Sequence, residues 1–175
     1  MYKPYRFLFI AFCLVSALSA PGHSASKSVI TDTKAVIGPI LELTISQNGQ
    51  SQLKFGNILP VASGPTEVGP IVMIIDVKAN TGERYQVTQL MSGSLENATG
   101  NKLDLENLKF KTTSANASGT AVSSATQVSS TAQVIFTSDI TGSSDTISAE
   151  YFLTVPPLQE PGDYSANLTY TVSSL

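Results

Sequence analysis

Few side chains in this sequence have the chemistry that nucleophilic or metal-dependent catalysis requires. The chain of 175 residues contains one cysteine, Cys13, and one histidine, His23. Serine–histidine and cysteine–histidine nucleophiles both need a histidine, and the usual zinc sites draw on cysteine and histidine. Because both residues fall in an N-terminal stretch that we expect to be removed, the rest of the chain should support neither kind of site.

Carboxylates are the remaining candidates. Asp104 and Glu106 are two positions apart, a spacing that would put both on one face of a strand, as a carboxylate-based hydrolase could use. Asp139 and Asp145 flank Gly142 and have oxygens that suit Ca²⁺. The simpler interpretations are a solvated strand face and a polar hairpin turn. We therefore expect no catalytic residue, no cofactor, no metal and no enzyme activity.

The N-terminal residues have the order of a secretion signal. Lys3 and Arg6 precede an apolar run over residues 7–20, which ends at Pro21–Gly22 before small residues. That run of about 14 residues is shorter than the ~20 that span a bilayer, and no second one follows. We expect residues 1–25 to be cleaved, leaving an exported protein without a membrane anchor that passes through the periplasm to the cell surface or the medium.

The remaining 150 residues, 26–175, are the usual size of one domain. The signal takes Lys3 and Arg6, so eight of the ten basic residues stay beside all thirteen acidic ones, a net charge of −5. This acidic balance argues against nucleic acid as a partner. A domain without cysteine has no disulfides, so packing and strand pairing must stabilise it.

Short runs of alternating apolar and polar residues, separated by turn residues, predict an all-β protein. The predicted strands and apolar patches are 40–45, 53–58, 71–77, 85–90, 103–110, 134–136, 147–155 and 164–172. About eight strands fit an immunoglobulin-like β-sandwich.

Local patterns add detail to this outline. An Asn-Gly pair predicts a tight turn at 47–50, and residues 60–70 predict a loop. The apolar run 71–77 predicts a central strand buried on both faces, forming a hairpin with 85–90. The stretch 112–131, made mostly of Ser, Thr, Ala and Gly, predicts a long mobile surface loop.

Four short motifs lie at the ends of these strands: Leu53–Gly56 (Leu-Lys-Phe-Gly), Tyr85–Thr88 (Tyr-Gln-Val-Thr), Val155–Pro157 and Pro161–Tyr164 (Pro-Gly-Asp-Tyr). Together they resemble the spore coat U and archaic chaperone-usher fimbrial subunits, a group of exported bacterial proteins with a pilin-like β-sandwich. The resemblance covers most of the mature chain. It implies a structural subunit of a surface fibre, such as an adhesive fimbria or pilus, or of a coat.

Subunits of that group lack one strand of their sandwich, and a neighbour's N-terminal extension fills the gap by strand addition. Residues 26–38 would be this extension, with Gly38–Pro39 as a hinge to the sandwich of 39–175. The face donated to the neighbour would consist of Val29, Thr31, Thr33, Ala35 and Ile37. The same alternation also fits a first strand that completes the subunit's own sheet.

The last strand is where the resemblance places pairing, first with a periplasmic chaperone and then with another copy or a related subunit. Leu168, Tyr170 and Val172 alternate there with polar residues and would face inward. Ser174 stands at the penultimate position, where the better-known fimbriae have an aromatic residue, which leaves the chaperone class open.

A freestanding exported module that binds a cell-wall or glycan ligand is the alternative function. Tyr85, Tyr151, Tyr164 and Tyr170 would then offer a stacking platform, although alternating tyrosines in sandwiches more often pack in the core. A self-complete monomer would favour this alternative over a fibre subunit.

Overall fold

The structure is a computed structural model that describes residues 34–116 and 118–175, so the predicted signal and residues 26–33 lie outside it. Residues Ile37–Leu175 form one compact unit. Its elements are β1 (Leu41–Ser46), β2 (Thr66–Ala79), β3 (Tyr85–Met91), β4 (Leu95–Glu96), β5 (Lys102–Leu103), the 3₁₀-helix η1 (Leu105–Asn107), β6 (Leu108–Ser114), β7 (Thr120–Ala121), β8 (Thr126–Gln127), β9 (Gln133–Thr137), β10 (Asp145–Val155) and β11 (Leu168–Ser174).

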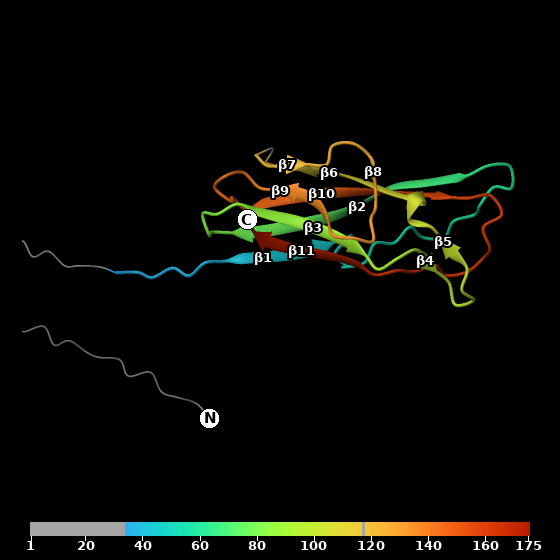
Figure 1. The fold of residues 1–175 in the computed structure, drawn as a ribbon, viewed down its shortest axis with the longest axis horizontal. Helices are drawn as coiled ribbons and strands as arrows, with labels where there is room; N and C mark the ends of the chain where they lie inside the picture. Colours follow the sequence, from blue (N-terminus) through green and yellow to red (C-terminus); the bar gives the residue numbers. More distant parts are fainter. Residues whose placement is uncertain (1–33, 117) are drawn as a thin grey trace, which may run out of the picture. The chain divides into compact units, whose positions relative to one another are not determined.

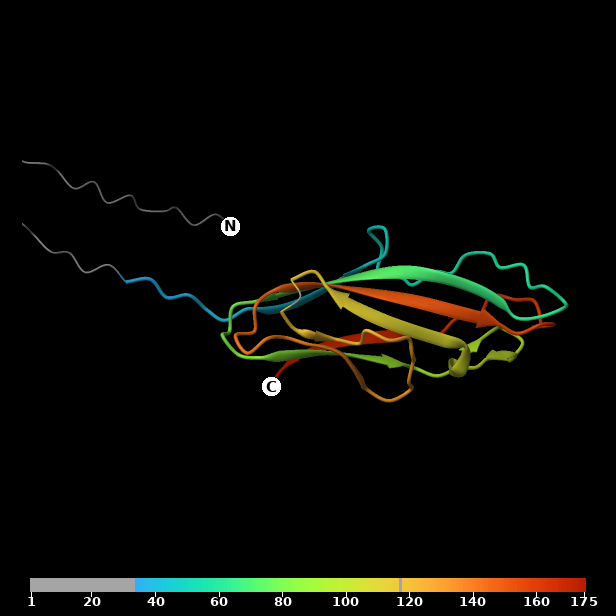
Figure 2. The ribbon, with the colours of Figure 1, turned by 90° about the horizontal axis from the view of Figure 1, so that it is seen from above.

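The long strands form two antiparallel sheets that face each other (Figures 1 and 2). One sheet has five strands in the order β1-β2-β10-β6-β8, and the other has four in the order β11-β3-β9-β7. A separate pair joins β4 to β5. This arrangement confirms the predicted all-β sandwich. In the described part of the chain, no helix has the length and apolar character needed to cross a membrane.

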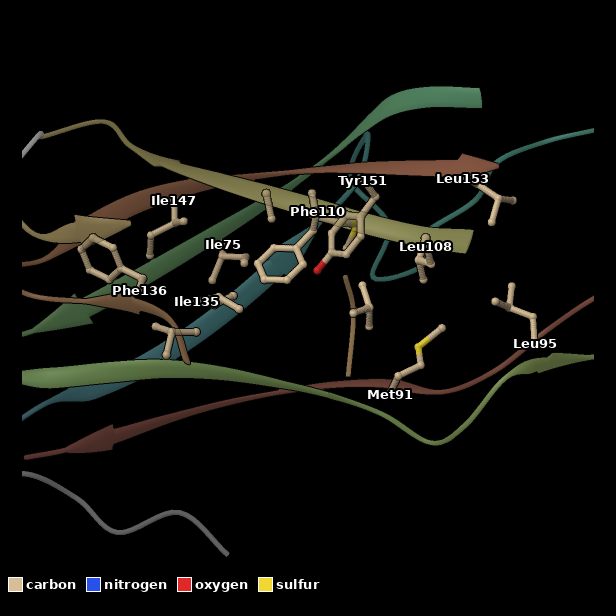
Figure 3. Close-up of a cluster of buried hydrophobic side chains, with 14 of the residues drawn as sticks. Ile75, Met91, Leu95, Leu108, Phe110, Ile135, Phe136, Ile147, Tyr151 and Leu153 are labelled. Atoms are coloured by element: carbon tan, nitrogen blue, oxygen red, sulfur yellow. The ribbon is translucent and has the colours of Figure 1, made fainter. Parts of the chain in front are cut away.

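The core lies between the two sheets (Figure 3). Strand β10 shows the predicted period of two most clearly, since every second residue from Asp145 to Val155 is buried. Phe110 packs on Tyr151 across β6 and β10, with ring centres 6.1 Å apart. The second sheet contributes Phe136, whose ring lies 6.1 Å from that of Tyr85. Alternation with one buried face is the expected pattern for a two-layer sandwich.

Three predictions for residues 60–90 need correction. β2 begins at Thr66, so part of the predicted loop at 60–70 is strand. The run 71–77 lies between β1 and β10 but is buried on one face only, because Val72 on the outer face is 40% exposed. The predicted hairpin is also wrong: β2 and β3 belong to different sheets, so the turn between them joins the two layers.

Residues 53–58 are not a strand in the structure. Leu53 and Phe55 pack against the core as their alternation suggests, but no neighbouring strand pairs with them. Instead the side-chain amide of Gln47 takes the place of a ladder partner for Lys54. Its Oε1 accepts the Lys54 N–H at 2.8 Å and its Nε2 donates to the Lys54 carbonyl at 3.3 Å. Alternation predicted the inward face correctly and the pairing wrongly.

Residues 112–131 are tied to the sandwich, so the prediction of a mobile surface loop is wrong. The stretch includes the end of β6 as well as β7 and β8. Thr112 donates its hydroxyl to the Ile135 carbonyl at 2.7 Å and accepts the Val122 N–H at 2.8 Å. Val128 is only 1% exposed. A hydroxyl-rich composition concealed these contacts, because threonine can bond to backbone groups inside a β-structure.

Candidate functional site

Among the described strands, no ladder of hydrogen bonds joins the two sheets where the edge strands β1 and β11 meet. Within residues 34–116 and 118–175, β1 pairs only with β2, and β11 pairs only with β3. The two edge strands nevertheless approach each other, as their ribbons show in Figure 1. We call this region the β1/β11 border. Each of the two therefore has a backbone edge there that no other described strand occupies.

At the β1/β11 border the apolar core is only partly covered by the described residues. The side chains that pack inward from the two edge strands are all half-buried: Leu41, Leu43, Ile45, Leu168, Tyr170 and Val172. By contrast, Ile75 on β2 and Val87 on β3, one strand further in, are fully buried. A strand added at the border would remove this apolar surface from water, which stabilises by about 25 cal/mol per Å².

The opposite border of the sandwich, between β7 and β8, differs because the core is covered there. Its edge strands β7 and β8 have two residues each, which leaves little backbone for another strand to join. The core beside them is complete, with Val128 and Ile135 at 1% and 0% exposure. Very short edge strands are a common protection against unwanted pairing.

β11 has none of the features that usually prevent an edge strand from pairing. Its seven residues, Leu168–Ser174, include no charged residue and no proline. Native proteins commonly place charges, prolines or bulges on exposed edges, because an unpaired edge recruits other strands. β11 is therefore the longest unprotected edge among the described strands.

A buried polar network holds β11 against the core. Tyr151 donates its hydroxyl to the Gln89 side-chain carbonyl, and the hydroxyls of Tyr151 and Tyr170 lie 2.7 Å apart. The Gln89 amide reaches the side-chain oxygen of Gln133 at 3.3 Å. Burial raises the pKa of Tyr170 to about 12 and raises the pKa of Tyr151 well above its ordinary value. The network links β10 of one sheet to three strands of the other.

The described end of the predicted donor segment is exposed and unpaired. Residues 34–40 form no strand, and Ile37 is 84% exposed. Where the chain enters the sandwich, Asn80 binds it: its N–H donates to the Ile40 carbonyl and its Nδ2 to the Gly38 carbonyl, both at 3.1 Å. Of the predicted donor residues, Ala35 and Ile37 are exposed, while Val29, Thr31 and Thr33 lie outside the described residues.

The candidate carboxylates Asp139 and Asp145 accept hydrogen bonds from different residues. Asp139 accepts hydrogen bonds from the Ser143 N–H at 3.1 Å and from the Thr141 hydroxyl at 2.9 Å, and these bonds lower the pKa of its carboxyl group. Asp145 instead accepts bonds from Thr146 and Ser114. In the described parts of the chain, no group of three or more His, Cys, Asp or Glu side chains is placed to hold a metal. The first aspartate organises its own turn.

The pairing of Asp104 with Glu106 on one strand face is wrong. Asp104 is the residue before the 3₁₀-helix η1, where its carboxylate accepts a bond from the Ser94 hydroxyl at 3.1 Å, and Glu106 lies inside the helix. The tyrosines do not form an outward platform either. Tyr85 and Tyr151 are buried, and the half-buried Tyr170 bonds to Tyr151.

Two residues that shape this region were not singled out from the sequence. Gln89 sits at an inward position of β3 and is fully buried, an unusual environment for glutamine. Its place inside the run Tyr85–Met91, where inward positions are otherwise apolar, was the available signal. Asn80 directly follows β2, and nothing local in the sequence indicated its bonds to a segment about forty positions earlier.

Comparison with protein-family models finds no match to this chain, and comparison with curated proteins finds none either.

Proposed function

We propose that this protein is a non-enzymatic structural subunit of a bacterial surface fibre, such as a fimbria or pilus, or of a coat, and that its copies are joined by β-strand exchange at the β1/β11 border. The observation that carries the proposal is the apolar core left half-exposed between two unpaired edge strands. An extended, exposed segment directly before β1 is the strand available to fill that border in another copy.

The physical support is a match between what the border lacks and what the segment offers. β11 has free backbone donors and acceptors along Leu168–Ser174, and an added strand would satisfy them. The alternating residues Val29, Thr31, Thr33, Ala35 and Ile37 would cover the half-buried side chains of the border. Two of them are threonines, so the donated strand is of modest hydrophobicity and the backbone ladder has to contribute much of the affinity.

Export and chaperoning belong to the same proposal. A free subunit with an unprotected edge and an open core would aggregate, because other strands can add to it. A periplasmic chaperone that occupies β11 until another copy arrives would prevent this. The order of charged, apolar and small residues in positions 1–25 supports secretion into that compartment.

The test is deletion of residues 26–37, which removes the donor and leaves the border intact. We expect the full mature chain to form ladders of multimers that survive mild SDS and collapse on boiling. The deletion variant should form no such ladder and should keep the same circular dichroism spectrum, since no described residue of the segment before Gly38 bonds to the sandwich. Ladders of equal length from the deletion variant would refute donation, and a full chain that refolds as a stable monomer would favour a freestanding binding module.

A further inference from the structure

The charged residues of the sandwich are distributed unequally between its two sheets. The strands β11, β3, β9 and β7 of the four-stranded sheet contain no charged residue. The strands of the five-stranded sheet contain eight: Glu42, Glu67, Asp76, Lys78, Lys109, Lys111, Asp145 and Glu150. Five of these are acidic and three are basic, so that sheet shares the acidic balance of the whole chain.

The outer surface of the four-stranded sheet is correspondingly neutral and rich in hydroxyl groups. Strand register places its outward residues in three rows: Leu90 with Thr169; Thr88 with Thr171 and Val134; Gln86 with Ser173, Thr137 and Thr120. All nine are exposed or half-buried. We call this surface the threonine face. In Figure 2 the four-stranded sheet is the lower of the two layers, and the segment between β8 and β9 extends below it.

We infer that the threonine face is a lateral contact surface whose partner is the same face of a second copy. Two copies of an acidic protein repel one another when their charged surfaces approach, and this face is where they can meet without that cost. Each threonine or serine hydroxyl both donates and accepts hydrogen bonds, so two such faces satisfy each other. Threonine side chains also lose little rotamer freedom on contact, since they are stiff at χ1.

The chemistry of the face disfavours a sugar ligand. Sugar rings stack on aromatic side chains. The aromatic residues of this sheet, Tyr85, Phe136 and Tyr170, all pack inward, and none is among the nine outward residues. A neutral glycan would therefore find hydroxyls and two aliphatic side chains but no stacking platform.

The size of the face sets the strength of the contact. The four strands have 7, 7, 5 and 2 residues. At a strand spacing of about 4.8 Å and a rise of about 3.4 Å per residue, these 21 residues cover roughly 340 Å². A stable complex buries about 800 Å² on each partner, so one pair of threonine faces is too small to hold two free subunits together. Subunits joined in a fibre present many copies of the face, and repeated weak contacts then add up to a stable association. This step rests on the proposed strand-exchange function and predicts that fibres associate side by side.

The experiment is Thr88→Lys on the threonine face, with Thr113→Lys as the matched control. Thr113 is an exposed threonine on β6 of the charged sheet, so the control makes the same change with the same added charge. Electron microscopy reports the width of fibre bundles, and low-speed sedimentation of the assembled fibres reports how strongly they self-associate side by side. Resistance to mild SDS reports strand exchange separately.

We expect Thr88→Lys to leave the SDS-resistant ladder intact, to give single fibres, and to weaken self-association at least tenfold, because like charges would then face each other. Thr113→Lys should behave like the wild type. Raising the salt to about 1 M shortens the Debye length to ~3 Å and should restore bundles of the Thr88→Lys fibres, which a folding defect would not allow.

Either of two results would overturn the inference directly: wild-type fibres that never bundle, or Thr88→Lys fibres that still bundle at low salt. A third would be a wild-type protein that does not self-associate but binds a neutral glycan, with that binding lost in Thr88→Lys. Absence of an SDS-resistant ladder in the wild type would instead refute the proposed function. Sedimentation of the free chain and its Thr88→Lys variant would then still decide whether the face associates.

Discussion

Replacing Tyr151 with phenylalanine tests whether the buried polar network secures the edge strand. The Tyr151 hydroxyl bonds to both Gln89 and Tyr170, and Tyr151 and Gln89 are fully buried. Its removal leaves the Gln89 oxygen without that donor, a cost of about 1–3 kcal/mol for a buried unsatisfied acceptor. Tyr170→Phe removes only the outer bond, so we expect it to cost about 0.5–1.5 kcal/mol.

Urea denaturation of both variants measures these costs, and the double variant Tyr151→Phe/Gln89→Leu tests their origin. Replacing both partners with apolar groups removes the unsatisfied acceptor, so the double variant should be more stable than the sum of its single changes predicts. Strict additivity, or a Tyr151→Phe variant no less stable than Tyr170→Phe, would show that the network does not act as a unit.

The same variants should differ in alkaline solution. Burial raises the pKa of Tyr170 to about 12 and that of Tyr151 well above 10, so the folded protein keeps protons that the unfolded chain releases. The stabilisation is complete below about pH 10 and is lost as the pH rises above it, at about 1.4 kcal/mol per pH unit for each tyrosine. Tyr151→Phe should flatten this decline between pH 10 and 11. An unchanged slope of unfolding free energy against pH would contradict the assigned burial.

Three further substitutions probe the border and its surroundings. Leu168→Asp puts a charge on the inward side of β11, which costs several kcal/mol and should prevent folding or assembly. Thr169→Asp, on the exposed side of the same strand, should fold and assemble. Export of the protein and SDS-resistant ladders of multimers report the two outcomes. Gly142→Ala should lower the free energy of unfolding, measured in urea, by about 2–4 kcal/mol. The reason is that φ is +61° at this position and a Cβ would lie 1.8 Å from the Glu83 carbonyl oxygen. A decrease below about 1 kcal/mol would mean that the turn relaxes. Asn80→Ala removes the side-chain oxygen that accepts the Ile40 N–H, together with the donor to the Gly38 carbonyl, and should increase amide exchange at Ile40 without unfolding the sandwich. Unchanged exchange at Ile40 would assign that restraint elsewhere.

The alternation along single strands could be predicted because it is local. The inward residues of β10 and the contact of Leu168, Tyr170 and Val172 with the core agree with the period of two in the sequence. Pairing between strands is not local, which is why the hairpin of β2 with β3 was predicted wrongly and the strand at 53–58 has no partner. Composition also misled, since the hydroxyl-rich stretch 112–131 is held by bonds from Thr112 that no pattern of hydrophobicity reveals.

The sequence by itself determined that this is an all-β chain with a single cysteine and a single histidine. Both follow from residue types and from a spacing of two, which each strand carries independently of its neighbours. Only the tertiary structure decided which strands lie at the edges, that the core is half-exposed between β1 and β11, and that one sheet has no charges on its strands. These features arise when distant segments come together, because edges, openings and surface charge belong to the assembled sheets and not to any single strand.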